Sequence, residues 1–316
     1  MIVALPSFLV ATWSDGVFSL TDDAIRQELA GHSVRSLVAD GRGGVLGIVG
    51  GHSLKRRSPD GQWFSIAHSD LDLYCCVSIG NVAFVGTDDA QILRISPDGT
   101  PEKLRGFDAV AGRDKWYAGG MLVDGKYVGP PLGIRSIAAT CDGAVLLANV
   151  HVGGIPRSTD GGATWEPTID IAADVHQVCA HPTRPAAAIA AAAVGLCVSS
   201  DAGHTWTVER RGLHEPYCSA VAFGRNDIFV AASNGPFAPQ GAVYRRPMDS
   251  DGPLSPLGGG MPKWTDGTVD TDCIAARDST IAAIDASGCL YVSSDDGGSW
   301  SQPFDRFPSP SGVYIC

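Results

Sequence analysis

The sequence has few basic residues. Its 316 residues include 23 Lys and Arg against 34 Asp and Glu, which gives a formal net charge of −11. A nucleic-acid partner would need a basic stripe, and an anionic membrane surface would also attract cations. We therefore expect neither nucleic acid nor a membrane among the partners of this protein.

Long helical and long apolar runs are also lacking. No long stretch shows the 3.6-residue hydrophobic period of an amphipathic helix. The apolar stretch at residues 2–10 is too short to span a bilayer and has no basic flank, so we interpret it as a strand and not as a signal peptide. Together with 39 Gly, these absences favour an all-β protein with many turns.

Disulfide spacing and local catalytic motifs are absent. The nine cysteines are an odd number without scaffold-like spacing, which predicts thiols and a reducing cytoplasm. There is no G-x-S-x-G nucleophile elbow, no phosphate-binding glycine loop after a strand and no H-x-x-x-H pair. Any chemistry must therefore come from residues that the fold brings together.

One eight-residue pattern, S-x-D-x-G-x-[ST]-W, occurs three times, at residues 158–165, 199–206 and 293–300. It predicts a turn between two strands. The Asp carboxylate would accept hydrogen bonds from backbone N–H groups two or three residues on, the Gly would supply a positive φ, and the Trp would bury its ring between neighbouring sheets. Replacing Trp165, Trp206 or Trp300 by Ala should each cost about 3–5 kcal/mol of stability.

This pattern resembles the Asp-box, or bacterial neuraminidase repeat, of the sialidase-like β-propellers, and all three copies match it at every defined position. The resemblance implies that the boxes are structural. It places them between the third and fourth strands of a blade, on the rim opposite the usual active site. It does not imply a function, because the same device occurs in sialidases, sorting-receptor ectodomains and photosystem assembly factors.

Apolar runs predict seven blades. Runs that fit second strands recur about every 40 residues, at 8–12, 45–49, 82–86, 144–150, 186–192, 227–232 and 280–285. Inner strands are expected at 34–39, 74–78, 134–139, 175–180, 218–223 and 271–276. For the first blade, the inner strand comes from residues 312–316 or 2–5. We favour the C-terminal segment because it leaves no open sheet edge.

The expected fold class is therefore an all-β, seven-bladed β-propeller of four-stranded antiparallel blades, with a six-bladed ring as the alternative. Residues 1–316 would form one domain. Loops that join fourth to first strands, and second to third strands, share one face, here called the top. Six of the eight histidines fall on or beside top loops: His32, His52, His68, His151, His176 and His214. The long insertion at about 106–133 is expected there too.

The top of the central channel is thus the expected small-molecule site. Catalytic roles are expected for His151, His176, Asp174, Asp272 and Tyr217, and ligand binding for Trp13, Arg135, Trp116, Tyr117, His214 and Glu215. His52, His151 and His176 are the candidate metal ligands, because converging neutral imidazoles suit a divalent transition metal such as Zn, Fe, Cu or Mn. Without a metal, the same residues would form an acid–base site.

Two functions of different classes fit this sequence. One is a cytoplasmic enzyme, a metal-dependent or histidine acid–base hydrolase, lyase or oxidase. The other is a non-catalytic scaffold or assembly factor that binds a protein through an exposed patch around Trp116, Tyr117 and Trp264. Exo-sialidase or other glycosidase activity is not favoured, because the arginine-bearing F-R-I-P-like motif of sialidases is missing near the start.

Overall fold

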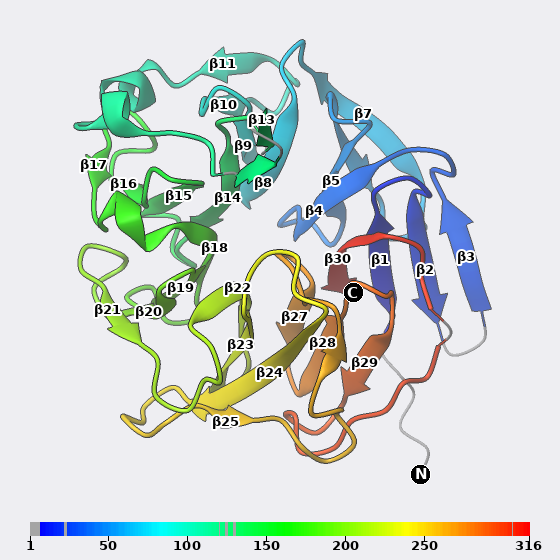
Figure 1. The fold of residues 1–316 in the computed structure, drawn as a ribbon. Coiled ribbons are helices and arrows are strands. Elements are labelled where there is room, and N and C mark those ends of the chain that lie inside the picture. Colours follow the sequence, from blue (N-terminus) through cyan, green and yellow to red (C-terminus); the bar gives the residue numbers. More distant parts are fainter. Residues whose placement is uncertain (1–6, 22–23, 120, 124–125, 129–130, 305) are drawn as a thin grey trace. The chain divides into compact units, whose positions relative to one another are not determined.

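Antiparallel sheets account for nearly all regular structure in the protein. The computed structural model describes residues 7–21, 24–119, 121–123, 126–128, 131–304 and 306–316. These residues form seven sheets of three to five strands and one separate hairpin (Figure 1). This is the architecture of a seven-bladed β-propeller, and the number of sheets excludes the six-bladed alternative.

Two compact units divide the chain. One comprises Met1–Leu37 and Glu209–Cys316, and the other comprises Val38–Val208. Strands β4 and β21 cross the boundaries between them.

The unit of residues 38–208 contains four sheets whose strands pair in chain order. They are β4 (Val34–Ala39), β5 (Val45–Val49), β6 (Ser53–Arg57) and β7 (Trp63–His68); β8 (Leu73–Ile79), β9 (Val82–Thr87), β10 (Ile92–Ile95) and β11 (Pro101–Lys103); β14 (Ile134–Ala139), β15 (Leu146–Val150), β16 (Pro156–Ser158) and β17 (Glu166–Pro167); and β18 (Val175–Ala180), β19 (Ala188–Ala192), β20 (Gly195–Ser199) and β21 (Thr207–Glu209). The second strands β5, β15 and β19 are buried at every position, since they are covered on both faces.

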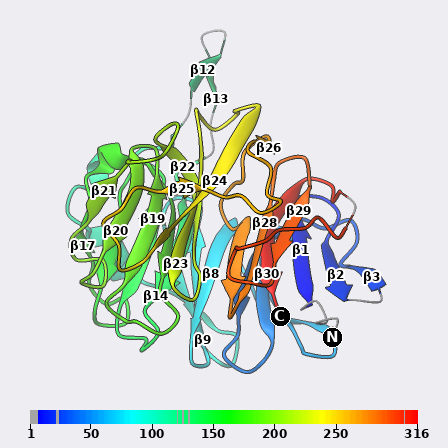
Figure 2. The ribbon, with the colours of Figure 1, turned by 90° about the horizontal axis from the view of Figure 1, so that it is seen from below.

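The same unit carries three short 3₁₀ helices and a hairpin outside the sheets. The helices are η1 (Arg105–Ala109), η2 (Arg113–Lys115) and η3 (Ile171–Ala173), and the hairpin pairs β12 (Met121–Val123) with β13 (Lys126–Val128). Figure 2 shows that the hairpin extends beyond the ends of the neighbouring strands of its unit. No helix in the described part of the chain has the length and apolar character needed to cross a membrane.

The other unit contains three sheets. They are β1 (Phe8–Thr12), β2 (Val17–Thr21), β3 (Ala24–Glu28) and β30 (Pro310–Ile315); β22 (Tyr217–Phe223), β23 (Asp227–Ser233), β24 (Gln240–Pro247), β25 (Ser255–Pro256) and β26 (Thr265–Asp266); and β27 (Ile274–Arg277), β28 (Thr280–Ile284) and β29 (Leu290–Ser293). In the last sheet the fourth strand is reduced to a single bridge between Val292 and Ser301.

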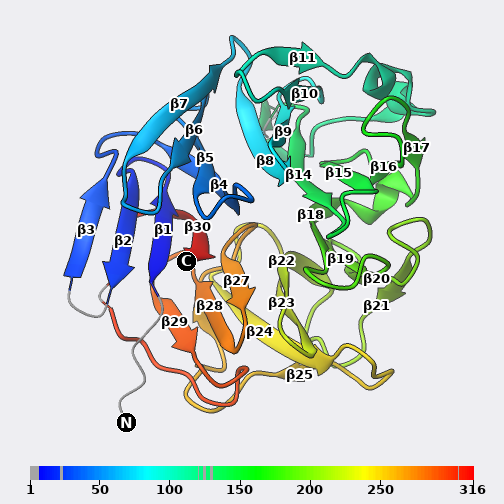
Figure 3. The same ribbon diagram turned by 180° about the vertical axis from the view of Figure 1, so that it is seen from behind.

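The C-terminal strand completes the first sheet. β30 pairs with β1 in antiparallel register, with Phe8 opposite Ile315 and Val10 opposite Val313 (Figure 3). The prediction that the C-terminal segment supplies the inner strand is therefore confirmed. The alternative segment, residues 2–5, lies outside the described residues.

All seven predicted second strands agree with the structure to within two residues at each end, as does every predicted inner strand but one. The exception among the inner strands is the one expected at 271–276, since β27 begins only at Ile274. Residues 270–273 form a turn instead, in which the Cys273 N–H donates to the Asp270 carbonyl and Asp272 has a φ of 63°. The predicted second strand 280–285 ends at Ile284, because Asp285 starts the turn that leads to β29.

The three S-x-D-x-G-x-[ST]-W segments, here called the Asp turns, have one hydrogen-bond network. In the first, Ser158 Oγ donates to Asp160 Oδ1 at 2.8 Å and accepts from the Gly162 N–H at 2.9 Å. Asp160 accepts from the Thr164 N–H and hydroxyl at 2.9 and 2.6 Å, and Trp165 Nε1 donates to the Gly162 carbonyl at 2.9 Å. The other two Asp turns contain the same five bonds at 2.6–3.1 Å.

This network extends the expected reach of the Asp carboxylate. The Thr164 N–H that Asp160 accepts at 2.9 Å lies four positions on, while the Ala163 N–H, three positions on as expected, also lowers the pKa of Asp160. The N–H two positions on, that of Gly162, donates to the Ser158 hydroxyl instead. Gly162 has a φ of 91°, a backbone conformation that favours glycine, and a Cβ there would lie 2.5 Å from Leu104 Cδ1, so the leucine side chain would have to move. The predicted position between third and fourth strands is confirmed for the turns that join β16 to β17 and β20 to β21.

The insertion at 106–133 runs along the sheet β14–β17 instead of staying at one end of it. At its start, the Phe107 ring contacts the Trp165 ring at 5.1 Å, beside the Asp turn. Farther on, the Tyr117 N–H donates to the Val152 carbonyl at 3.2 Å, at the other end of the sheet. Only this second part therefore lies where the sequence predicts the whole insertion.

Candidate metal centre

Two imidazoles and one carboxylate meet where β15 ends and β18 begins. Nε2 of His151 lies 3.5 Å from Oδ1 of Asp174, and Nε2 of His176 lies 3.7 Å from Oδ2 of the same carboxylate. Ligand atoms of the three residues lie within 4.8 Å of one another, so the group could hold a metal ion. Both histidines are buried and the aspartate is half-buried.

The local backbone structure positions these three side chains close to one another. His151 follows β15 directly, two positions after Asn149, so both side chains leave the chain on the same side. The Asn149 amide donates to the Val175 carbonyl at 2.7 Å and thereby ties β15 to β18. Asp174 and His176 flank Val175. Asp174 caps η3 with a left-handed φ of 48°, which turns the chain into β18.

The electrostatics of the group favour a neutral His151 ring beside an ionised Asp174 carboxylate. Burial lowers the pKa of His151 to about 4, the charges of Arg135 and His176 add to this, and Asp174 opposes it. Burial opposes ionisation of Asp174, but the hydrogen bond and charge from His176, with His151 and Arg135, outweigh it and lower the pKa of Asp174. His151 and Asp174 are thus in the protonation states that a metal ion needs.

The insertion reaches this group through a backbone contact. The Gly119 N–H donates to Nδ1 of His151 at 3.0 Å. A Cβ on Gly119 would lie 2.3 Å from Cε1 of that ring, so the backbone lies directly against the imidazole. Because Nδ1 accepts this bond, the proton of the neutral ring lies on Nε2, facing Asp174.

A divalent metal fits these residues on the condition that the proton of the His151 ring moves from Nε2 to Nδ1. Two imidazoles with one carboxylate are a common donor set for Fe(II) and Zn, and three protein ligands leave further positions open. A metal-bound histidine normally carries its proton on the other ring nitrogen. Binding through Nε2 of His151 would therefore move the proton to Nδ1 and end the acceptance of the Gly119 N–H.

The group lies at the end of its sheet opposite the Asp turn. His151 follows β15, whereas the turn that contains Trp165 follows the antiparallel neighbour β16. The same strand order separates His176, at the start of β18, from the turn that contains Trp206, after β20. Within residues 38–208, the expected assignment of histidines and Asp turns to opposite ends is thus confirmed.

His52, the third candidate metal ligand, lies in a different cluster. Its Nε2 is 3.7 Å from Asp72 Oδ1, its Nδ1 contacts the Leu71 carbonyl at 3.2 Å, and its ring lies 6.2 Å from that of His68. Nearby Asp88 is partly buried, and burial with the charges of Asp72 and Asp89 raises its pKa. The geometry joins His151 and His176 to Asp174 and does not join His52 to them.

The candidates in the other unit lie in separate settings. Asp272 is partly buried, and burial with the charge of Asp270 raises its pKa to about 6. Tyr217 is half-buried at the start of β22. Trp13 is 52% exposed, with the Arg35 guanidinium 5.7 Å from its ring.

His214 and Glu215, also in this unit, are exposed. His214 Nδ1 lies 2.7 Å from the Tyr244 hydroxyl, and its ring meets that of Trp264 at 4.8 Å. Burial lowers the pKa of His214, and Glu215 opposes this.

Trp116 is a core residue, contrary to its expected role in ligand binding. Its side chain is buried, 5.6 Å from the Phe107 ring, with the Arg113 guanidinium 5.0 Å from its own ring. An aromatic in a loop can pack against the sheet below, and sequence does not show which aromatics do so. Tyr117 is 58% exposed, so the two neighbours have opposite environments.

Sequence reasoning missed two residues of the site. Gly119 acts through its backbone N–H, which has no side-chain signature. Asn149 lies within a buried strand, and its Nδ2 makes the bond that ties the two sheets together. The available signal for Asn149 was its place as the one polar residue in the otherwise apolar run of residues 145–150.

Solved structures share the fold at low sequence identity. A putative 6-phosphogluconolactonase from Bacteroides uniformis has a TM-score of 0.63 at 10% identity, over 98% of this chain and 99% of that chain. The WD40 β-propeller domain of Doa1 has a TM-score of 0.60 at 13% identity, over 95% and 85%. A GH74 xyloglucanase from Xanthomonas campestris has a TM-score of 0.55 at 16% identity, over 85% of this chain and 46% of that chain.

These similarities concern the fold alone, since propellers with so little shared sequence differ widely in function. No protein-family model matches the sequence. A search of curated proteins finds no match either.

Proposed function

We propose that the protein is a metal-dependent enzyme whose ligands are His151, Asp174 and His176. The observation that carries the proposal is the meeting of these three side chains from two neighbouring sheets, with ligand atoms within 4.8 Å of one another. Three protein ligands leave room for water or substrate, as in catalytic centres, whereas structural zinc sites are closed by four. The metal would supply Lewis-acid or redox chemistry for a hydrolase, lyase or oxidase reaction.

The surrounding residues suit a small anionic substrate. Arg135 stands at the start of β14, close enough for its charge to act on both His151 and Asp174. Its guanidinium makes no ion pair with any described residue, so it can bind a substrate carboxylate bidentately. Gly119 covers the His151 ring and keeps water from one side of it.

The scaffold alternative has less support. Of the three aromatic residues expected in its exposed patch, Trp116 is buried in the core, while Tyr117 and Trp264 are exposed. The contact of the insertion with His151 also favours a covered polar site over a flat protein-binding surface. A site in which ligands, a cation and a covering backbone converge is the kind that binds small molecules.

We also propose a structural family for the Asp turns, a cellular compartment and a class of partner. The Asp turns are interpreted as Asp-boxes of the sialidase-like propellers, on the strength of their shared residues and hydrogen bonds. The compartment is proposed to be the cytoplasm. None of the nine cysteines, all within the described residues, forms a disulfide, and six are buried. A small molecule is the proposed partner, with no role for nucleic acid or membrane.

Metal titration tests the proposal. Untagged, chelator-treated protein should bind about one equivalent of Co²⁺ or Zn²⁺, with the d–d absorption of a nitrogen- and oxygen-ligated cobalt. His176→Ala and Asp174→Asn should each weaken binding by at least ~10–100-fold. His204→Gln is the control, because this histidine lies exposed within the Asp turn of residues 199–206, outside the metal-ligand group.

Circular dichroism would show whether each variant folds. Less than about a tenth of an equivalent of every metal in the folded wild-type protein would contradict the proposal. Equal binding by the wild type and both ligand variants would also contradict it.

A further inference from the structure

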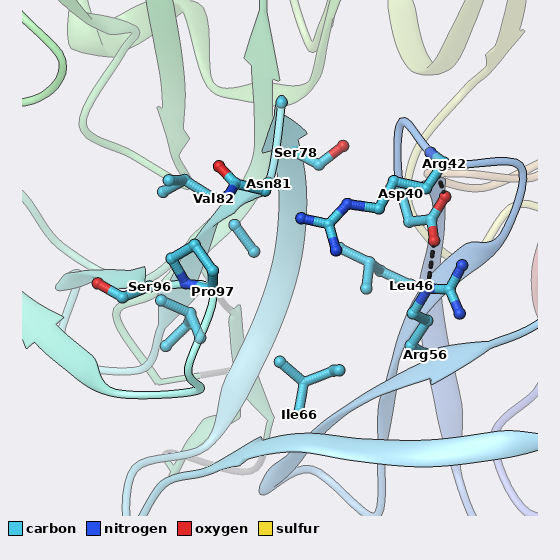
Figure 4. A pocket seen from close by; sticks show the side chains of 13 residues that line it. Asp40, Arg42, Leu46, Arg56, Ile66, Ser78, Asn81, Val82, Ser96 and Pro97 are labelled. Carbon is cyan, nitrogen blue, oxygen red and sulfur yellow. Dashed lines mark hydrogen bonds and ion pairs between the residues drawn. The ribbon is translucent and has the colours of Figure 1, made fainter.

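A pocket lies between the sheets β4–β7 and β8–β11, at the ends that carry the β4–β5 and β8–β9 turns (Figure 4). Its empty space, part of which is open to solvent, is about 460 Å³. The Ser78 hydroxyl donates to the Ala39 carbonyl at 2.7 Å and holds the two sheets together beside it. Its turns are the first-to-second and third-to-fourth connections of their sheets, so it lies at the opposite strand ends from His151.

One guanidinium in this pocket is available to a ligand. Figure 4 shows the Arg42 side chain extending into the pocket toward Ser78 and Asn81. Its backbone N–H donates to Asp40 Oδ1 at 2.7 Å, which positions the residue. No described residue accepts a hydrogen bond from its guanidinium, and none forms an ion pair with it.

The neighbouring carboxylate is already satisfied. Asp40 is buried and contacts Arg56 through Oδ2, while its Oδ1 also accepts the Gly44 N–H at 2.7 Å. Burial opposes ionisation, but these hydrogen bonds and the Arg56 charge keep the pKa of Asp40 low. Among the described residues that line the pocket, only Asp40, Arg42 and Arg56 are charged, which leaves one net positive charge there on a chain of net charge −11.

The rest of the lining has two kinds of surface. Asn81 and Ser96 supply uncharged polar groups to the lining. The remaining wall is largely apolar and comes from both sheets: Leu46, Ile66, Val82, Ala83, Ile95 and Pro97. A ligand that matches this pocket has a charged group at one end and an apolar body at the other.

We propose that this pocket binds a small monocarboxylate with a compact apolar body, through a bidentate contact to Arg42. A planar guanidinium matches a carboxylate in geometry, and a single net positive charge matches a single negative one. A phosphate dianion would lack a second cation and would leave the apolar walls without a contact. The site is independent of the proposed metal centre, since no lining residue belongs to both.

Calorimetric titration with benzoate tests the proposal. The wild-type protein should bind benzoate with a dissociation constant on the order of 1 mM, as expected for a ligand of this size. Arg42→Gln should weaken binding by about 10–100-fold, since it removes a charged hydrogen-bond donor. Arg105→Gln makes the same charge change at an exposed position outside the pocket and should leave binding unchanged.

Benzamide and inorganic phosphate are the comparison ligands that test which chemical class the pocket binds. Benzamide has the same body without the charge and should bind at least ~10-fold more weakly than benzoate. Equal binding of benzoate and benzamide, or tighter binding of phosphate, would overturn the assignment of ligand class. Absence of benzoate binding to the wild type up to about 20 mM, or undiminished binding to folded Arg42→Gln, would overturn the site itself.

Discussion

The Gly119 N–H donates a hydrogen bond to Nδ1 of His151 at 3.0 Å, which connects the long insertion directly to the candidate metal centre. The bond selects the ring tautomer with its proton on Nε2, toward Asp174. It also links metal binding to the position of the insertion, because a metal on Nε2 would require Nδ1 to carry the proton. The glycine is therefore a positioning residue for this imidazole.

Gly119→Ala should disturb the site more than the fold. The added Cβ would lie 2.3 Å from Cε1 and 2.6 Å from Nε2 of His151, so the ring or the insertion must move. We expect Co²⁺ affinity to change by about 10-fold or more, with a loss of about 1–3 kcal/mol in the free energy of unfolding. Nitrogen NMR of the wild-type imidazole should show Nδ1 unprotonated in the absence of metal.

Gly258→Ala is the control for this substitution, because its Cβ would meet no atom within 4 Å. An unchanged Co²⁺ affinity and an unchanged imidazole spectrum in Gly119→Ala would show that the contact with His151 has no role in the site.

The tryptophans of the Asp turns should differ in their contribution to stability. Trp165 is 8% exposed and meets Phe107 edge to face, so Trp165→Ala should cost about 3–5 kcal/mol. Trp206 is only half-buried, and Trp206→Ala should cost roughly 1–3 kcal/mol because less apolar area is lost. Urea unfolding of both variants measures the difference. The reverse order would mean that burial of these rings does not determine their effect.

Acid should weaken the Asp turns over a defined pH range. Hydrogen bonds from the Thr164 side chain and backbone and from Ser158 lower the pKa of Asp160 to about 2. A folded pKa below the unfolded value of about 3.9 contributes stability that is present above about pH 4 and is lost as the pH falls through about 2. Asp160→Asn should therefore lose less stability between these pH values than the wild type, in thermal unfolding.

Asp114→Asn is the control for this experiment, since Asp114 is exposed and makes no hydrogen bond with a described residue. If its acid profile matches that of Asp160→Asn, the Asp turn is not the source of the effect.

The contribution of Asp272 to stability should have the opposite pH dependence from that of Asp160. Burial and Asp270 raise its pKa to about 6, so the folded state favours the protonated carboxyl. Its contribution to stability is fully present below about pH 4 and is lost as the pH rises through about 6. Asp272→Asn should remove this loss, and Asp270→Asn should shift it to lower pH. A wild-type protein whose stability does not fall between pH 4 and 6 more than that of Asp272→Asn would contradict the assignment.

Strand positions were predictable because their signal is local. Apolar runs such as residues 45–49 are continuous, and the turns between them contain Gly, Asp and Ser, so each boundary is visible in a few neighbouring residues. The expected inner strand at 271–276 was wrong at its start because the turn at 270–273 depends on the left-handed backbone of Asp272. Such a conformation has only a weak preference in sequence.

The candidate site was predictable only in part. Strand order places His151 after a second strand and His176 at the start of the next inner strand, so both were expected at the same end. Their approach to a shared carboxylate needs the distance between two sheets, which the packing of β15 against β18 determines. Trp116 and His52 illustrate the same limit of sequence analysis. The end of the sheet at which each residue lies could be predicted, but the side chains that each one contacts could not.

The chain's own sequence determined the number of its sheets and the network of its Asp turns, because both depend on contacts between residues close together in the chain. Only the tertiary structure decided which polar groups meet: Asp174 between two histidines, Gly119 against an imidazole, and Arg42 extending into a pocket between two sheets. Apart from the contact between Asp174 and His176, which flank Val175, these contacts join segments far apart in sequence. Their distances are set by how whole sheets pack, which no local pattern encodes.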